Sequence, residues 1–346
     1  MTPRSGKRAG SRAEPWSESL PRLLDPERAR PLLREACAGS GWSLAEILAS
    51  EIVQERPERR RTLRYRVLGG RADEEPREIL WFVKQYRGSK GERVWRRLRY
   101  LHAQTSPDVM TAEPLGYSPR LRLLVVRELQ GPTLAEALRG AFEEEDVEAS
   151  LRRAGRALAS VHRFADAPDG IGLEQHGPRE EIQVLESARA RVDAAALPPE
   201  LVHRFLAPCS RVEEDLARGE AAARTLLHRD LHPGQIVLRD DGIGLLDWDD
   251  ASWGEPELDL GNLEAHLLLE DLRRLGSTGP ARSRIDALRR GYWTCGTFDP
   301  ERLETYLASA LLRLATLERL AHPSLSVLAW PELFRELIEL APLGRG

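Results

Sequence analysis

The sequence is poor in the residues and segments that crosslink a protein or anchor it in a membrane. It contains only three cysteines, Cys37, Cys209 and Cys295, and their odd number and wide spacing indicate neither a disulfide framework nor a zinc knuckle. No apolar run approaches the ~18 residues of a membrane span. The N-terminus, MTPRSGKRAGSRAEPWSESL, lacks the apolar stretch of a secretory signal. We therefore expect a cytoplasmic protein with no membrane partner and a short disordered leader over residues 1–24.

Lysine is nearly absent among the basic residues. Of 51 Lys and Arg residues, only Lys7, Lys84 and Lys90 are lysine. The charges are uneven, with a net +9 over residues 1–100 and −13 over the remainder. This asymmetry is compatible with an anion against the first third, and equally with ordinary solvated faces. Basic residues neither dominate nor interleave with aromatics, so no nucleic-acid partner is expected.

The apolar pattern changes character along the chain. Residues 43–53, 62–69, 77–86 and 120–129 read as strands with short connections, which favours an antiparallel sheet, and residues 26–38 and 91–104 read as helices. From Thr133, where Glu136 completes the spacing of a capping box, the pattern is mostly helical. We predict an α+β protein with a sheet-rich N-lobe over residues 25–130 and a larger helical C-lobe over residues 131–346.

One stretch in the helical part departs from this pattern. TLLHRDLHPGQIVLRDDGIGLLDWDDA runs from Thr225 to Ala251, and its two apolar segments flank Asp-Asp-Gly, a strong hairpin signal. The hairpin is expected to place Asp247 opposite Ile236 or Gln235, near the loop that carries Asp230. Carboxylate and amide oxygens are hard ligands that suit Mg²⁺ rather than zinc.

The order of these polar residues matches a known catalytic motif. His228-Arg229-Asp230, Gln235 and Asp247-Trp248-Asp249 follow the spacing of a kinase catalytic loop and its metal-binding strand pair. The segment resembles the aminoglycoside phosphotransferase-like family of small-molecule kinases, and GEPELDLGNL with Asp259 resembles that family's downstream segment. The resemblance covers about residues 40–320 and is most specific over residues 228–260. It implies a bilobal protein-kinase-like fold, ATP and Mg²⁺ as cofactors, and a small-molecule acceptor.

The resemblance also implies roles for individual residues. Asp230 would act as the catalytic base, in a catalytic loop that His228 braces. Gln235 and Asp247 would hold Mg²⁺. Asp249 is a further candidate ligand because Asp-x-Asp places two carboxylates on the same side of an extended chain, although a solvent-facing acid fits equally well.

The first lobe should supply a cation for the nucleotide phosphates. Lys84 lies inside the apolar strand ILWFVKQY, which suggests a need for a compact ammonium group, although an edge lysine reaching solvent is the alternative. Glu92 is the first candidate for its acidic partner. A solvated Glu near a helix N-terminus is nearly as compatible with the sequence.

The adenine site is implied by the resemblance alone. The stretch from Glu128 to Gly131 would be the hinge whose backbone groups bind the base. Trp81, Phe82 and Val126 are candidates for the apolar purine slot or for plain core.

Two departures keep other functions open. The turn expected to cover the phosphates, QERPERRR, has no glycine, and Arg59, Arg60 and Arg61 either bind phosphate there or decorate a hairpin tip. Gln235 stands where the family usually has Asn. These departures suit a catalytically weak or inactive, pseudokinase-type nucleotide-binding regulator. The triple His228, Asp230 and His232 is also compatible with a metal-dependent hydrolase, on weaker grounds.

Overall fold

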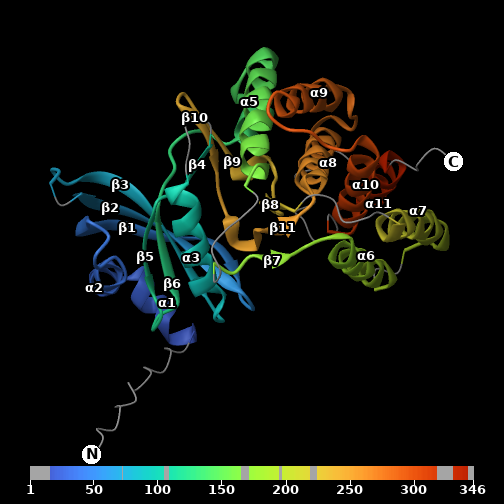
Figure 1. The fold of residues 1–346 in the computed structure, drawn as a ribbon. Coiled ribbons are helices and arrows are strands. Elements are labelled where there is room, and N and C mark those ends of the chain that lie inside the picture. The colour runs from blue at the N-terminus through green and yellow to red at the C-terminus, as the bar shows by residue number, and fades with distance from the viewer. Residues whose placement is uncertain are drawn as a thin grey trace, which may run out of the picture. The chain divides into compact units, whose positions relative to one another are not determined.

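The computed structural model describes residues 16–71, 73–104, 109–164, 171–194, 197–218, 224–317 and 330–341. The chain divides into two compact units (Figure 1). The first unit comprises residues 1–104, 111–129 and 170–172, and the second comprises residues 105–110, 130–169 and 173–346. The first contains an antiparallel sheet and the second is mostly helical. This composition confirms the predicted α+β class.

The first unit is built on a five-stranded sheet in the order β1-β2-β3-β6-β5. Its neighbouring strands are all antiparallel, as short connections require. The sheet consists of β1 (Trp42–Arg56), β2 (Arg60–Arg71), β3 (Arg77–Tyr86), β5 (Pro114–Ser118) and β6 (Leu123–Arg127). The sequence indicated four of these strands but not β5, which is short and contains a glycine. Helix α3 (Lys90–Ala103) follows β3.

The second unit is dominated by helices. They are α4 (Leu134–Glu136), α5 (Glu144–His162), α6 (Pro178–Asp193), α7 (Pro199–Arg218), α8 (Pro256–Leu275), α9 (Gly279–Trp293), α10 (Pro300–Leu317) and α11 (Trp330–Leu340). The predicted capping box is confirmed: the Glu136 N–H donates to Thr133 Oγ1, and the Thr133 N–H donates to Glu136 Oε2. None of the described helices is both long and apolar enough to cross a bilayer. The cytoplasmic location stays a prediction.

Short strands complete the second unit. They form two three-stranded sheets, β4-β10-β9 and β7-β11-β8. The strands are β4 (Val109–Thr111), β7 (Glu174–Gln175), β8 (Thr225–Leu227), β9 (Ile236–Arg239), β10 (Gly242–Leu245) and β11 (Ser252–Gly254).

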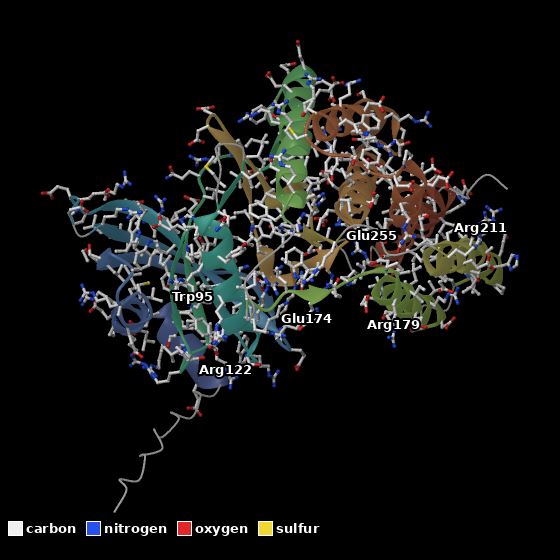
Figure 2. All side chains as sticks on the ribbon, in the orientation of Figure 1. Trp95, Arg122, Glu174, Arg179, Arg211 and Glu255 are labelled. Atoms are coloured by element: carbon white, nitrogen blue, oxygen red, sulfur yellow. The ribbon has the colours of Figure 1, made fainter. Side chains whose placement is uncertain are left out.

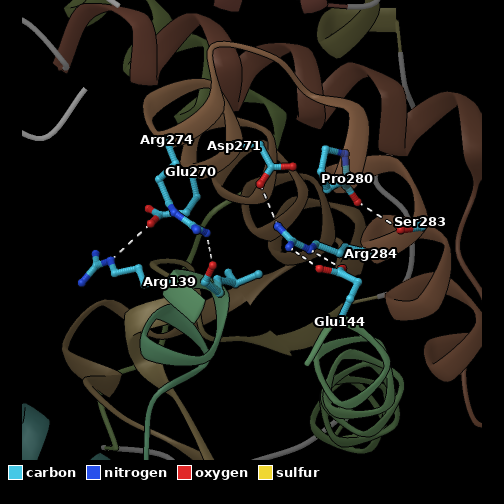
Figure 3. A network of polar contacts seen from close by, with 9 residues as sticks. Arg139, Glu144, Glu270, Asp271, Arg274, Pro280, Ser283 and Arg284 are labelled. Atoms are coloured by element: carbon cyan, nitrogen blue, oxygen red, sulfur yellow. Dashed lines mark hydrogen bonds and ion pairs between the residues drawn. The ribbon is translucent and has the colours of Figure 1, made fainter. Parts of the chain in front are cut away.

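A buried arginine joins the ends of three helices of the second unit (Figure 3). Arg284, near the start of α9, donates to Asp271 on α8 at 2.7 Å and to both carboxylate oxygens of Glu144 on α5 at 2.7 and 2.6 Å. The bidentate geometry matches a planar guanidinium to a carboxylate. The hydrogen bonds that Arg284 donates to Glu144 are the main cause of its raised pKa. This network links the start of α5 and the end of α8 to α9.

Strand alternation gives the first-unit sheet two different faces. Leu63, Trp81 and Val83 belong to one buried core that also contains residues of α1 (Trp16–Leu24) and α2 (Pro26–Ala36). Lys84 follows Val83, so its side chain points to the opposite face. It is half-buried there. The lysine expected to bind phosphates is therefore separated by the sheet from the core that α1 and α2 cover.

The N-terminal helix α1 corrects one prediction. Residues 16–24 are helical, so the predicted disordered leader over residues 1–24 is wrong for this part; residues 1–15 lie outside the described residues. The helix buries Ser19 and Leu23. It is hard to recognise from sequence because it is only 9 residues long and contains Pro21.

Arg61 ties α1 to the sheet. Its side chain is 1% exposed, and its Nε donates to Gln85 Oε1 at 2.7 Å. Its Nη2 donates to the Trp16 carbonyl and to Ser19 Oγ, each at 2.8 Å, and the guanidinium lies 4.3 Å from the centroid of the Trp16 ring. Burial lowers the pKa of Arg61, and the Glu55 carboxylate opposes that shift. Arg61 is therefore a structural residue and not the phosphate ligand considered from the sequence.

Replacing Arg61 by Met is expected to destabilise the protein by about 2–4 kcal/mol, because the substitution removes the charged donor from the buried oxygens of Gln85, Ser19 and Trp16. Urea unfolding followed by circular dichroism measures this difference. Arg64→Met is the matched control on the same strand. Its ion pair with Glu51 is exposed, so its loss should cost less than about 1 kcal/mol. Equal effects of the two substitutions would contradict the role of Arg61.

Candidate active site

A β-hairpin forms the frame of the candidate site, as predicted. Strands β9 and β10 pair antiparallel around a two-residue turn. In this turn Arg239 donates to both oxygens of Asp241, at 2.8 and 3.0 Å. The pKa of Asp241 is lowered chiefly by this hydrogen bonding. Asp241 thus serves the turn and not the site.

The register of this hairpin sets the place of Asp247. Leu245 pairs with Ile236, and the following N–H, that of Leu246, donates to the Gln235 carbonyl at 2.9 Å. Asp247 therefore lies one position beyond Gln235, and not opposite Ile236 or Gln235 as predicted. The expected register was wrong because the second strand begins at the glycine before the apolar run. Asp247 and Gln235 are nevertheless near neighbours.

One buried carboxylate holds the backbone of the catalytic loop. Asp259, in the first turn of α8, accepts from the N–H of His228 and from the N–H of Arg229, each at 2.7 Å and each with a different oxygen. Arg229 has a φ of 73°, a left-handed conformation that costs a non-glycine residue about 1–2 kcal/mol. Hydrogen bonds to a charged group contribute about 1.5–3 kcal/mol each, so the two together outweigh this cost. Asp259 thus fixes the two residues that precede Asp230.

Asp259 is held in its ionised form in spite of complete burial. Burial by itself raises the pKa of this carboxyl, but the hydrogen bond and charge of His162, helped by His228, outweigh it, so the pKa of Asp259 lies below its usual range. His162 Nε2 lies 3.2 Å from Asp259 Oδ2, and His162 Nδ1 lies 2.8 Å from the Tyr292 hydroxyl. Helices α5, α8 and α9 therefore meet at the carboxylate that holds the loop.

His228 braces the catalytic loop. Its side chain is fully buried, and its Nε2 lies 2.6 Å from the Leu246 carbonyl. Since a carbonyl only accepts, this nitrogen carries the proton. The His228 ring also lies 4.8 Å, centroid to centroid, from the Trp248 ring. His228 therefore joins the loop to the segment of Asp247.

Asp230 and Asp247 both act on the imidazole of His232. The pKa of His232 is lowered, mainly by burial and also by nearby basic groups, while the Asp230 and Asp247 carboxylates oppose the shift. Both carboxylates therefore lie within electrostatic range of one ring. His232 Nδ1 accepts from the Gly234 N–H at 3.1 Å, which fixes the ring at the start of a short 3₁₀ turn.

The candidate metal ligands come from adjacent segments. Gln235 closes that 3₁₀ turn, Asp247 has φ 58° and ψ 57°, and Asp249, in the next 3₁₀ turn, is 4% exposed. A left-handed non-glycine residue is uncommon and often marks a functional position. One amide and two carboxylates form a donor set that fits Mg²⁺. No cluster of three or more His, Cys, Asp or Glu suited to a metal exists within the part of the chain that the structure describes, so Mg²⁺ there would need Gln235, water or phosphate oxygens as further ligands.

The sheet of the first unit separates the residues considered for purine binding. Trp81 is fully buried in the core on the face opposite to Lys84, so it is a core residue. Phe82 and Val126 are partners across β3 and β6 and share the face of Lys84 by alternation. The cross-strand partners of Lys84 itself are Thr62 and Leu124.

Glu92 does not have the predicted environment. Its carboxylate is 49% exposed and accepts from Arg96 Nη2, one turn further along α3, at 2.6 Å. The exposure of Glu92 corrects the predicted inward orientation of its side chain, and its pairing with Lys84 stays a prediction. The expected inward face was wrong because α3 buries Arg97 together with Val94 and Leu98, which turns Glu92 toward solvent.

Two backbone groups of the predicted hinge form hydrogen bonds, one within each unit. The Glu128 N–H donates to the Leu80 carbonyl at 2.9 Å, and burial raises the pKa of the Glu128 carboxyl against the opposing charge of Arg64. The Gln130 carbonyl accepts from Arg239 Nη1 at 2.8 Å. These two backbone groups therefore have hydrogen-bond partners within the protein.

The glycine-free turn between β1 and β2 is held by a single arginine. Arg87 Nη1 donates to the Pro57 carbonyl at 3.1 Å and to Glu58 at 2.8 Å, and the Arg87 N–H donates to the Arg59 carbonyl at 2.9 Å. Side-chain contacts thus stabilise a turn in which protein kinases use glycines.

Two residues that support the site were not identified from the sequence. His162, at the end of α5, holds Asp259. Asn262, three residues after Asp259 on α8, donates from Nδ2 to the Leu231 carbonyl at 2.8 Å. Their only signal in the sequence is a polar residue within an apolar helical stretch.

Replacing Asp259 by Asn is expected to destabilise the protein by about 2–4 kcal/mol at pH 7, because an amide cannot accept from both backbone N–H groups. The depressed folded-state pKa of Asp259 means that its stabilisation is complete above the unfolded carboxyl pKa of about 4 and is lost as the pH falls through the folded value. Urea unfolding should therefore show a stability difference that shrinks as the pH falls below about 4.

Asp286→Asn, on the exposed side of α9, is the control and should change stability by less than about 0.5 kcal/mol. A difference between wild type and Asp259→Asn that stays constant with pH would contradict the assigned role of the Asp259 carboxylate.

Comparison with known proteins identifies the family and the fold of this chain. The sequence profile of the phosphotransferase enzyme family matches residues 53–306. The search of curated proteins found no significant match. Among solved structures, the chain is similar to the amicoumacin kinase hAmiN in complex with AMP-PNP, Ca²⁺ and Ami, with 16% identity, a TM-score of 0.60, and coverage of 94% of this chain and 97% of that chain.

Two further solved structures show the same fold. The macrolide 2'-phosphotransferase MphH from Brachybacterium faecium is 19% identical with a TM-score of 0.52, over 91% of this chain and 99% of that chain. The choline kinase from Cryptosporidium parvum Iowa II is 12% identical with a TM-score of 0.58, over 90% of this chain and 93% of that chain. These likenesses confirm the expected bilobal kinase-like fold. Because the family profile spans well over half of the sequence and includes the catalytic loop and the hairpin, this chain belongs to the phosphotransferase enzyme family.

Proposed function

We propose that this protein transfers the γ-phosphoryl group of ATP, with Mg²⁺, to a hydroxyl or less often an amine of a small molecule such as a sugar, an aminoglycoside or an amino alcohol. The observation that supports this most directly is that the hairpin places Asp247 one position beyond Gln235, next to the loop whose backbone Asp259 holds directly before Asp230. A base and a metal-binding carboxylate in one small neighbourhood are what phosphoryl transfer to an alcohol requires.

The residues of the second unit have separate roles in this proposal. Asp230 orients the acceptor hydroxyl and accepts its proton, while Gln235, Asp247 and Asp249 hold Mg²⁺. When bound, Mg²⁺ neutralises charge on the phosphate oxygens. The transition state is stabilised mainly by position and charge, so the fixed backbone around Asp230 contributes directly to the rate.

The first unit contributes the cation. Among the described residues of this arginine-rich chain, Lys84 is the one lysine within a strand, and we assign its ammonium group to the α and β phosphates. Phe82 and Val126, on the same sheet face, are assigned to the purine. The segment that starts at Glu128 supplies backbone groups to the purine, and Glu92 is assigned as the acidic partner of Lys84.

A small acceptor fits the segment after Asp247. Only residues 248–255 separate Asp247 from α8, and nearly all of them are buried. This segment ends at Glu255, labelled in Figure 2, whose Oε2 accepts from Arg302 at 2.9 and 2.7 Å and from the Tyr306 hydroxyl at 2.6 Å. A segment so short and so firmly held leaves no extended platform for a peptide substrate. The similar structures named above are kinases or phosphotransferases of amicoumacin, macrolides and choline.

A nucleotide-binding regulator of pseudokinase type is the alternative function. It is favoured by Gln235 in place of Asn and by the glycine-free turn after β1. Both departures affect how the metal and phosphates are held. Such a regulator would bind ATP with Mg²⁺ but transfer no phosphate.

Asp230→Asn keeps the shape of the side chain while it removes the base. We expect kcat to fall by roughly 10²–10⁴-fold with ATP affinity within about twofold of the wild type, as measured by ADP release over a broad panel of hydroxyl and amine acceptors and by nucleotide titration. Asp240→Asn, at the exposed hairpin turn, is the matched control and should keep full activity. Unchanged turnover of the Asp230 variant would exclude its role, and ATP binding by the wild type without transfer to any acceptor would favour the regulator.

Gln235→Asn introduces the shorter amide side chain that the family motif usually has at this position. Because Mg²⁺ tolerates little distortion of its octahedral shell, the shorter side chain should leave the Mg²⁺ concentration for half-maximal activity unchanged or lower it. A Mg²⁺ titration of ADP release measures this. Loss of folding, seen as a lost thermal transition, would show that the loop around Gln235 is misassigned.

A further inference from the structure

Asn262 is the only asparagine in the sequence. It lies inside helix α8, where it is 3% exposed. Asparagine is a poor residue for the buried interior of a helix, because its short amide competes with the backbone for hydrogen bonds and loses water on burial. A buried amide at this position therefore calls for a specific donor and a specific acceptor beside it.

The amide of Asn262 has both partners. Its Nδ2 donates to the Leu231 carbonyl at 2.8 Å, and its Oδ1 accepts from Nη2 of Arg313 on α10. A guanidinium can only donate and a carbonyl can only accept, so these two neighbours fix which end of the amide faces which. An asparagine satisfies both at once, whereas a carboxylate would face the Leu231 carbonyl with an oxygen, and an apolar side chain would satisfy neither.

This amide completes the hold of α8 on the catalytic loop. Asp259 accepts from the N–H groups of the two residues before Asp230, at 2.7 Å each. Asn262, three residues further along α8 and on the same side of the helix, donates to the carbonyl of the residue after Asp230. Side chains of one helix therefore bind the loop backbone on both sides of the proposed base.

Close packing of α8 and α10 sets the position of Arg313. A Cβ atom on Gly261, directly before Asn262, would lie 2.7 Å from the backbone nitrogen of Leu307 on α10, so the two helix backbones are in contact at this crossing. Earlier residues of α10 also bind the Glu255 carboxylate that precedes α8. Arg313 thus reaches the amide from a helix that cannot slide along α8 without breaking these contacts.

We propose that Asn262 and Arg313 are positioning residues for phosphoryl transfer. Arg313 orients the amide of Asn262, the amide holds the Leu231 carbonyl, and the loop keeps Asp230 in place for the acceptor hydroxyl. This assignment rests on the function proposed above and adds α10 to the elements that support the site. Because both residues act through the loop backbone, their loss should lower kcat and leave ATP binding intact.

Asn262→Asp separates a role in positioning from a role in stability. The new carboxylate still accepts from Arg313, so the link between α8 and α10 is kept, but an oxygen replaces the donor to Leu231. We expect kcat to fall at least about tenfold with the KM for ATP within about twofold of the wild type, as measured by ADP release with the best acceptor of the panel used for Asp230→Asn. Gln183→Glu makes the same amide-to-acid change on the exposed side of α6 and should act like the wild type.

A conservative variant at Arg313 tests the orientation of the amide. Arg313→Met removes the donor to Asn262 Oδ1 and should lower kcat about two- to fivefold. Arg313→Lys keeps a donor and should restore at least about half of the wild-type kcat. Wild-type kcat in the Met variant, or the same reduced kcat in both variants, would overturn the role of Arg313. If Asn262→Asp does not fold, these two variants decide.

NMR measures the contact of the amide with the loop without any turnover. Labelling with carbonyl-¹³C leucine and ¹⁵N histidine selects the three Leu-His peptide bonds of the full chain, Leu101–His102, Leu227–His228 and Leu231–His232. In Asn262→Asp the carbonyl carbon of Leu231 should move upfield because it loses its donor. The carbonyl carbons of Leu101 and Leu227 should keep their chemical shifts and so report that the fold is intact.

Two results would overturn the proposal: a Leu231 carbonyl signal that Asn262→Asp leaves unchanged, and a wild-type kcat in that variant although the signal moves. The two proposals can fail separately. If the signal moves but the wild type transfers phosphate to no acceptor, the amide holds the loop and the proposed kinase function fails. If transfer depends on Asp230 but Asn262→Asp is fully active, the kinase function stands and the positioning role fails.

Discussion

The candidate site depends on one buried carboxylate that accepts two consecutive backbone N–H groups. Asp259 binds the N–H of His228 and that of Arg229 at 2.7 Å each, and it holds Arg229 in a left-handed conformation. Without these two hydrogen bonds, the cost of the strained backbone directly before Asp230 would not be offset. His162 and Tyr292 extend the anchor into the helical core. The geometry of the proposed base is thus set by groups that do not touch the substrate.

Much of the site could be predicted from the sequence because its chemistry is local. Asp230, Gln235 and Asp247 lie within one short stretch, and Asp-Asp-Gly between apolar runs indicates the hairpin that returns Asp247 to Gln235. The register was missed by one to two positions, since the pattern of apolar residues does not fix where a strand begins. Asp259 was visible as part of a motif, but its contact with His162, 97 residues away, is a product of helix packing that no spacing rule reveals.

The first unit shows where an arginine-rich sequence misleads. Three long strands and α3 could be predicted from periodicity, but the pairing of Glu92 could not, because α3 buries one arginine and exposes others. Arg61 lies in a run of arginines at the end of a charged turn, yet it is fully buried beneath α1. Arginine carries a long apolar stem and a planar donor group, so it serves in cores, ion pairs and anion sites alike. Composition alone does not separate these uses.

Amide hydrogen exchange at His228 and Arg229, measured by NMR on the protein without nucleotide or metal, tests the central claim most directly. If Asp259 fixes the catalytic loop before any ligand binds, both amides should exchange only through global unfolding, as slowly as the amides in the centre of α8. Exchange of these two amides as fast as that of exposed loop amides, under conditions where α8 remains protected, would show that the loop is not held by Asp259 and would contradict the account.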